Sequence, residues 1–123
     1  MKKFKALSLS LFIVMCMATA VLAAYPEKNI QGIIQWGAGG GCDGVSRAIT
    51  PLAEKYLGKT IILQNKTGAT GAVATTMVAN MPADGYTLLY AAENPATYRV
   101  LGLSPLSFND FEPIIIPVEG AVV

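Results

Sequence analysis

The sequence contains no histidine and only two cysteines among its 123 residues. Without imidazole, a Ser-His-Asp or Cys-His catalytic group, a histidine proton shuttle and the common zinc sites are all excluded. One cysteine, Cys16, lies in the N-terminal apolar segment, so the rest of the chain has a single thiol, Cys42, and no intramolecular disulfide forms there. Charged residues are scarce, at 14%, and no basic stretch suited to nucleic acid occurs. We expect stability from packing alone, and no metal, cofactor or nucleic-acid partner.

The first 23 residues have the pattern of a secretory signal peptide. Three lysines precede an apolar run over residues 6–21, and Val21 and Ala23 occupy the −3 and −1 positions of a cleavage site after Ala23. The run is also long enough to be an uncleaved membrane anchor, but the small residues at its end favour cleavage. We therefore expect export to the periplasm and a mature chain that begins near Ala24.

Beyond this leader, residues 24–123 alternate apolar strand patterns with helical ones, over a length typical of one modest domain. Strands that alternate with helices predict an α/β fold, with a parallel sheet and flanking helices. The predicted elements, in order, are a strand over 30–36, a helix over 43–57, a strand over 60–64, a helix over 71–81, a strand over 86–91, a short helix over 95–101 and a fourth strand over 111–118.

The longest predicted helix begins at Asp43, a residue type that caps helix N-termini, and ends before Gly58. Pro51 lies inside it, so we expect either a bend there or a helix that begins at Pro51. Its apolar residues fall on one face at helical spacing. They are Val45, Ile49, Leu52, Ala53, Tyr56 and Leu57.

Two glycine-rich segments, residues 37–41 and 65–71, each follow a predicted strand and precede a predicted helix. In a parallel sheet both loops lie at the carboxyl edge of the strands, where open α/β proteins bind ligands. The N–H groups and partial positive charge of a helix start favour an anion, and glycine lets it approach the backbone closely. The alternative is that the glycines only form tight turns.

Other features allow different functions. Residues 39–44 match the dinucleotide pattern G-x-G-x-x-G, but the second strand leads into Gln64 and Asn65 instead of an acidic ribose ligand. Cys42 at a helix start is a candidate thiolate nucleophile, although the chain offers no histidine as its base. An exported small α/β enzyme that uses Cys42 or Asp43 is therefore the alternative to a binding protein, and a structural module without a ligand is a third reading.

Five side chains near the same edge each have two possible roles. Glu93 follows the third strand and is either a solvated loop acid or a contact for a ligand ammonium group. Arg47 and Lys66 are expected to be solvated charges, and the alternative is that either assists a bound anion. Tyr98 and Arg99 are expected to pack on the surface of the short helix over 95–101, and the alternative is that they line the ligand cleft.

Five segments of the chain together match a known pattern, the last of them more weakly. They are Tyr25–Lys28, Trp36–Asp43, Asn65–Gly71, Pro82–Leu89 and Asp110–Ile114. These segments resemble the substrate-binding receptors of tripartite tricarboxylate transporters, the Bug-type family of periplasmic solute-binding proteins. The resemblance implies a periplasmic receptor with two α/β lobes, a Venus-flytrap fold, that closes on a small carboxylate and acts as a monomer with membrane transporter subunits as partners.

The resemblance also implies which residues hold the ligand, through loop amides and bridging water. The candidate set is Ala38, Gly39, Gly40, Gly41, Cys42, Asp43, Asn65, Gly68, Ala69, Gly71, Ala72 and Glu93. Ala38 and Cys42 stand where many members have proline and a hydroxyl residue. Glu93 occupies a stretch that is often neutral, which widens the expected ligand to a zwitterionic, amino-acid-like molecule. Family members are much longer, so residues 24–123 are expected to be an incomplete first lobe, or else a nonfunctional truncated remnant.

Overall fold

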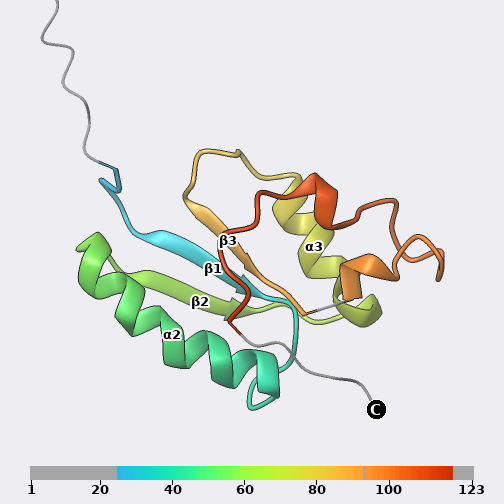
Figure 1. The fold of residues 1–123 in the computed structure, drawn as a ribbon, viewed down its shortest axis with the longest axis horizontal. Helices are drawn as coiled ribbons and strands as arrows, with labels where there is room; N and C mark the ends of the chain where they lie inside the picture. The colour runs from blue at the N-terminus through green and yellow to red at the C-terminus, as the bar shows by residue number, and fades with distance from the viewer. Residues whose placement is uncertain (1–24, 93, 118–123) are drawn as a thin grey trace, which may run out of the picture.

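The computed structural model describes residues 25–92 and 94–117, which form a three-stranded parallel sheet between two helices (Figure 1). The strands follow the spatial order β2-β1-β3. Since parallel crossovers are right-handed, this order places the two helices on opposite faces of the sheet. The elements are β1 (Ile30–Ile34), α2 (Gly41–Leu57), β2 (Ile61–Asn65), α3 (Ala72–Ala79) and β3 (Thr87–Tyr90), with short 3-10 turns η1 (Ala69–Gly71), η2 (Asn94–Ala96) and η3 (Phe108–Asp110). The expected parallel α/β sheet with flanking helices is confirmed.

The core lies around β1, because this central strand is covered on both faces. Ile30, Ile33 and Ile34 are at most 1% exposed. Gly32 pairs with Leu63 of β2 and Leu88 of β3 in the two parallel ladders. The apolar run that predicted a buried central strand is thus confirmed, although the strand ends two residues earlier than expected.

The helix α2 begins two residues earlier than predicted and runs without interruption through Pro51. Its N-cap is Gly40, so the prediction that Asp43 caps the helix is wrong, and so is a start at Pro51. Pro51 removes the N–H that would bind the carbonyl of Arg47. Both residues are exposed, and water can replace the missing donor.

The predicted apolar face of α2 is only partly the buried one. Leu52 and Tyr56 are 64% and 87% exposed, whereas Ser46 and Thr50 are buried. These hydroxyls donate to carbonyls one turn earlier, Ser46 to Cys42 at 2.6 Å and Thr50 to Ser46 at 2.7 Å. Because their hydrogen bonds are satisfied locally, small polar residues pack against the sheet at little cost.

The elements after β2 differ from prediction mainly at their ends. α3 ends at Ala79, two residues early, and the expected helix over 95–101 is reduced to η2 and turns. Residues 111–117 form no strand, and Ile114, Ile115 and Ile116 are 76%, 69% and 81% exposed. An apolar run becomes a strand only with a neighbour to complete its ladder, and no described strand lies beside this one.

The described chain begins with a segment fixed to the turn before β3. The Tyr25 hydroxyl donates to the Gly85 carbonyl at 2.6 Å, and the Tyr25 and Tyr86 rings meet edge to face at 5.1 Å. The Lys28 ammonium lies 4.4 Å from the centre of the Tyr86 ring. The predicted signal peptide lies outside the described residues and stays a prediction. No helix in the described part is long and apolar enough to span a membrane.

Two glycine-to-alanine substitutions should have opposite effects on stability. A Cβ at Gly32 would lie 2.6 Å from Leu63 Cδ2 and 2.8 Å from Tyr90 Cε2, so Gly32→Ala should lower the free energy of unfolding by about 1–3 kcal/mol. Gly44 in α2 is exposed and has open space around it, so Gly44→Ala should raise it by about 0.5–1 kcal/mol. Urea denaturation measures both; a Gly32→Ala variant as stable as the parent would contradict the packing described here.

Candidate ligand-binding site

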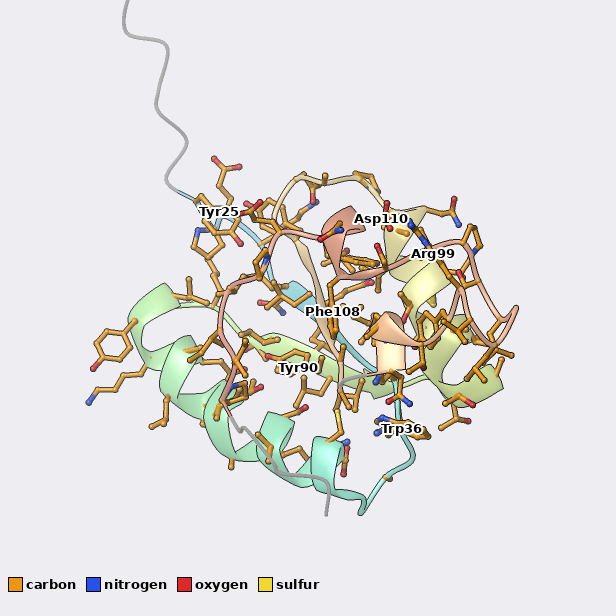
Figure 2. The ribbon with its side chains drawn as sticks, turned by 45° about the vertical axis from the view of Figure 1, so that its right-hand side comes forward. Tyr25, Trp36, Tyr90, Arg99, Phe108 and Asp110 are labelled. Carbon is orange, nitrogen blue, oxygen red and sulfur yellow. The ribbon has the colours of Figure 1, made fainter. Side chains whose placement is uncertain are left out.

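The loops that follow the three strands meet at one edge of the sheet, because parallel strands all end there. The loop after β1, which contains Trp36 (Figure 2), leads into α2, and the loop after β2 leads through η1 into α3. The segment after β3 enters η2, which packs beside η1. The predicted meeting of the two glycine loops at one edge is confirmed.

Asp43 is the centre of the first loop. It is the third residue of α2 and only 4% exposed. Its Oδ2 accepts the Gly39 N–H at 2.9 Å, and its Oδ1 accepts Arg47 Nε and Asn65 Nδ2, each at 2.9 Å. The hydrogen bond from Arg47, followed by those from Gly39 and Asn65, holds the pKa of the Asp43 carboxyl well below its ordinary value of 3.8. Asp43 is therefore ionised, and both of its oxygens are engaged.

Asn65 connects the end of β2 to the first loop. Its Nδ2 also donates to the Trp36 carbonyl at 2.8 Å, and its Oδ1 accepts Arg47 Nη2 at 3.0 Å. Asp43, Arg47 and Asn65 thus form a closed triangle of side-chain hydrogen bonds, called here the Asp-Arg-Asn triad. The expectation that Arg47 is only a solvated charge is wrong; its i,i+4 spacing from Asp43 on a helix was the available signal.

The second loop contains four consecutive residues with positive φ. The φ angles of Gly68, Ala69, Thr70 and Gly71 are 133°, 45°, 54° and 87°. The Gly68 carbonyl accepts the N–H of Gly71 at 2.9 Å and of Val73 at 3.4 Å, so the start of α3 is closed by its own turn. The left-handed conformation disfavours residues with a Cβ, and Ala69 and Thr70 both adopt it.

Several exposed backbone N–H groups at this edge have no acceptor among the described residues. They belong to Gly41 at the start of α2, which has no side-chain cap, and to Gly68, Ala69 and Thr70 in the second loop. Thr70 lies within residues 68–72, where the resemblance implied ligand contacts, but its left-handed backbone conformation could not be read from the sequence. The arrangement offers main-chain donors to an anion from both loops.

The other predicted site residues lie in different environments. Most of the predicted loop residues are exposed, and Gly71 is buried. The exposed ones are Ala38, Gly39, Gly40, Gly41, Gly68 and Ala69. Ala72 is 4% exposed and lies beneath them. The Cys42 thiol is half-buried and donates to the Tyr90 carbonyl at 3.6 Å, toward the end of β3. Glu93 lies outside the described residues.

A second polar network lies behind the loops and was not predicted. Gln35, Thr75 and Tyr98 are each fully buried. Gln35 Oε1 accepts the Ala92 N–H at 2.7 Å and Trp36 Nε1 at 3.1 Å, which directs its amide nitrogen to the Tyr98 hydroxyl at 3.5 Å. That hydroxyl lies 3.2 Å from Thr75 Oγ1. Tyr98 is therefore a core residue joining the segment after β3 to β1 and α3, and the expectation of a helix-surface position is wrong.

Gly71 is required beside this network. Thr75 Oγ1 donates to its carbonyl at 3.0 Å, and a Cβ at Gly71 would lie 2.9 Å from both Gln35 and the Tyr98 hydroxyl. Its φ of 87° also disfavours any side chain. The buried network and the left-handed turn thus determine each other's position.

The edge itself is open. One hollow of about 420 Å³ lies against α3 and includes Ala69 and Ala72, and another of about 580 Å³ is lined by Arg99 and residues 102–105. Arg99 is already engaged there, by the Pro105 carbonyl at 2.7 Å and Asp110 at 3.8 Å (Figure 2). Neither hollow reaches residues 39–43. No group of three or more His, Cys, Asp or Glu suited to a metal occurs in the described part.

Solved structures that resemble this chain are solute-binding proteins. A TctC solute binding protein from Polaromonas, solved with no ligand, matches 73% of this chain and 31% of its own, with 36% sequence identity and a TM-score of 0.69. MatC from Rhodopseudomonas palustris, solved with bound malate, matches 53% of this chain and 22% of its own, with 37% identity and a TM-score of 0.52. The fold and its loop edge thus place the chain in the class of solute-binding proteins, of which it matches a part.

The family model described as tripartite tricarboxylate transporter family receptor matches residues 45–122. Protein BugT of Bordetella pertussis is 35% identical to the chain over 94 residues, a match that covers 72% of the chain and 29% of BugT. The chain belongs to the tripartite tricarboxylate transporter receptor family, as its resemblance implied. It spans less than a third of the length of this curated relative. Members of the family are receptors and not enzymes, which argues against an enzyme that uses Cys42 or Asp43.

Removing one buried hydroxyl should test the second network. Tyr98→Phe leaves the buried amide nitrogen of Gln35 without its acceptor, and should lower the free energy of unfolding by about 1–3 kcal/mol. Tyr56→Phe is the matched control, because Tyr56 is 87% exposed and should change the value by less than about 0.5 kcal/mol. Equal effects of the two substitutions in urea denaturation would contradict the network.

The lowered pKa of Asp43 predicts how stability depends on pH. A carboxyl with a folded-state pKa below its unfolded value stabilises the fold above the unfolded pKa and loses this contribution as the pH falls through the folded value. The stability advantage of the parent over Asp43→Asn should therefore be constant above about pH 5 and shrink as the pH falls below 3.8. Denaturation series at several pH values measure it, and an advantage that does not change with pH would refute the assignment.

Proposed function

We propose that this edge of the sheet is one wall of a site that captures a small carboxylate ligand, and that backbone N–H groups bind it. The observation that carries the proposal is the set of exposed N–H groups without an acceptor among the described residues, at Gly41 in the first loop and Gly68, Ala69 and Thr70 in the second. Donors of this kind stabilise carboxylate oxygens without a cationic side chain.

The backbone strain of the second loop supports a role in binding. Holding Ala69 and Thr70 in left-handed conformations costs about 1–2 kcal/mol per residue. Such strain is concentrated at ligand-binding sites, where the surrounding structure maintains it. Here Gly71 and the buried Tyr98 network maintain the turn from behind, so its amides are already arranged before a ligand arrives.

Two loops of donors suit a ligand with more than one acidic group. The relative MatC was solved with bound malate, a small dicarboxylate, and we propose the same class of ligand for this chain. Glu93 follows the end of β3 in the sequence, so an amino-acid-like ligand with an ammonium group is the second ligand class that we propose. Asp43 keeps a further role beside its structural one, as support for a water that bridges to the ligand.

Membership of the receptor family supports a location, an oligomeric state and a partner for the protein. We propose that the leader directs the chain to the periplasm, that the chain acts as a monomer, and that a second lobe closes on the ligand before it passes to the membrane subunits of the transporter. The open edge agrees with this, since neither of the two hollows described above is lined by residues 39–43. Closure by a second surface supplies the burial that most small-molecule sites provide.

Titration with malate, followed by amide NMR of the isotopically labelled chain, tests the proposal. We expect dissociation constants of about 1 mM or weaker, because one open wall buries little of the ligand. The amide signals of Gly41, Gly68, Ala69 and Thr70 should shift most. Aspartate and glutamate in the same titration test the zwitterionic class, and their tighter binding would favour it.

The diamide of malate is the matched control, since it keeps the size of the ligand and loses both charges. It should produce no comparable shifts. Shifts of equal size with the diamide would contradict anion binding by the loops, and micromolar affinity for the chain alone would contradict the need for a second wall. A chain that folds but shows no shift with any ligand would favour a structural module or a nonfunctional remnant.

A further inference from the structure

The proposed anion site contains an ionised carboxylate of the protein. Asp43 lies in the first turn of α2, at the same helix start as the exposed N–H of Gly41, and its Oδ2 binds the N–H of Gly39. A like charge about 4 Å from a bound carboxylate lowers its affinity about fivefold even with the screening of bulk water, and more near a protein surface. A site built to attract carboxylates therefore needs the charge of Asp43 to be compensated.

Arg47 supplies this compensation in the structure. Its Nε lies 2.9 Å from Asp43 Oδ1, and this is the only ion pair that Asp43 makes among the described residues. The side chain of Asp43 is 6% exposed while that of Arg47 is 49% exposed, so the positive charge lies on the solvent side of the pair. A ligand that approaches from solvent meets the guanidinium together with the carboxylate, and the net charge of the pair is zero.

Arg47 also joins the two loops. Its Nη2 donates to Asn65 Oδ1 at 3.0 Å, while Asn65 Nδ2 binds Asp43 Oδ1 at 2.9 Å and the Trp36 carbonyl at 2.8 Å. A guanidinium presents several donors in one plane and reaches both acceptors at once, which the single ammonium of lysine does less well. The link holds the end of β2 against the first loop, and so fixes the distance between the two sets of N–H donors.

We propose that Arg47 is a positioning and specificity-determining residue of the ligand site, which makes the edge receptive to carboxylates by neutralising Asp43 and holding Asn65 in place. The inference rests on the proposed function, because it assumes that the anion binds at this edge. It goes beyond that function in assigning ligand-charge selectivity to a side chain that need not touch the ligand.

The test compares malate titrations, followed by amide NMR, of the parent chain, Arg47→Met, Arg47→Lys and the double variant Asp43→Asn with Arg47→Met. Arg47→Met leaves the Asp43 charge uncompensated and should weaken malate binding at least about fivefold. The double variant removes both charges, so it should bind malate more tightly than Arg47→Met, and more weakly than the parent because it also loses the ionic hydrogen bonds of the triad. Arg47→Lys keeps the positive charge but loses the planar guanidinium that donates to Asp43 and Asn65 at once. Its affinity for malate should therefore fall between those of Arg47→Met and the parent.

The outcomes separate this inference from the proposed function. If the parent shows malate-dependent shifts and Arg47→Met binds equally well, the role of Arg47 is refuted and the site stands. If the double variant binds as weakly as Arg47→Met, Arg47 is only structural and the charge argument is refuted. If the parent shows no shifts with malate, the proposed site fails and this inference fails with it. If Arg47→Met does not fold, Arg47→Lys and the double variant still test the role of Arg47. Compensation of the Asp43 charge predicts that both variants bind malate measurably, and a failure of both to bind would refute it.

Discussion

The carboxylate of Asp43 connects parts of the chain that lie far apart in the sequence. It receives hydrogen bonds from Gly39 in the first loop, from Arg47 one turn along α2 and from Asn65 at the end of β2. A sheet places the ends of its strands at one edge, but it does not determine how the loops beyond them are arranged. The Asp-Arg-Asn triad supplies this constraint, and the lowered pKa of Asp43 keeps it ionised under ordinary conditions. The geometry of the proposed donors depends on it.

The conformation of the second loop depends on a steric constraint instead. Gly71 fits against Gln35 and the Tyr98 hydroxyl with no room for a Cβ, and its left-handed backbone continues that of Ala69 and Thr70. Two glycine loops that look similar in the sequence are therefore stabilised differently, the first by ionic hydrogen bonds near the surface and the second by a buried neutral network. The first should respond to pH and to charge, and the second to changes of volume.

Much of the fold follows from local patterns. The strands around residues 30, 61 and 87 and the helices between them are each marked by apolar periodicity and glycine, and their alternation is sufficient to predict a parallel sheet with its glycine loops at one edge. Local patterns were insufficient where strand formation or burial depends on contacts with residues elsewhere in the chain. Residues 111–117 are apolar enough for a strand, yet no described strand lies beside them, and Leu52 and Tyr56 of α2 are exposed while Ser46 and Thr50 are buried.

The sequence by itself thus determined the class of fold, the family and the two loops in which a site was expected. Only the tertiary structure decided what the residues in and around these loops do. Asp43 is the acceptor of three donors instead of a helix cap, Arg47 is its ion-pair partner and Tyr98 lies in the core. The reason is physical: strand and helix preferences arise between residues close in sequence, whereas a hydrogen bond between Asp43 and Asn65 exists only after the sheet has brought them together.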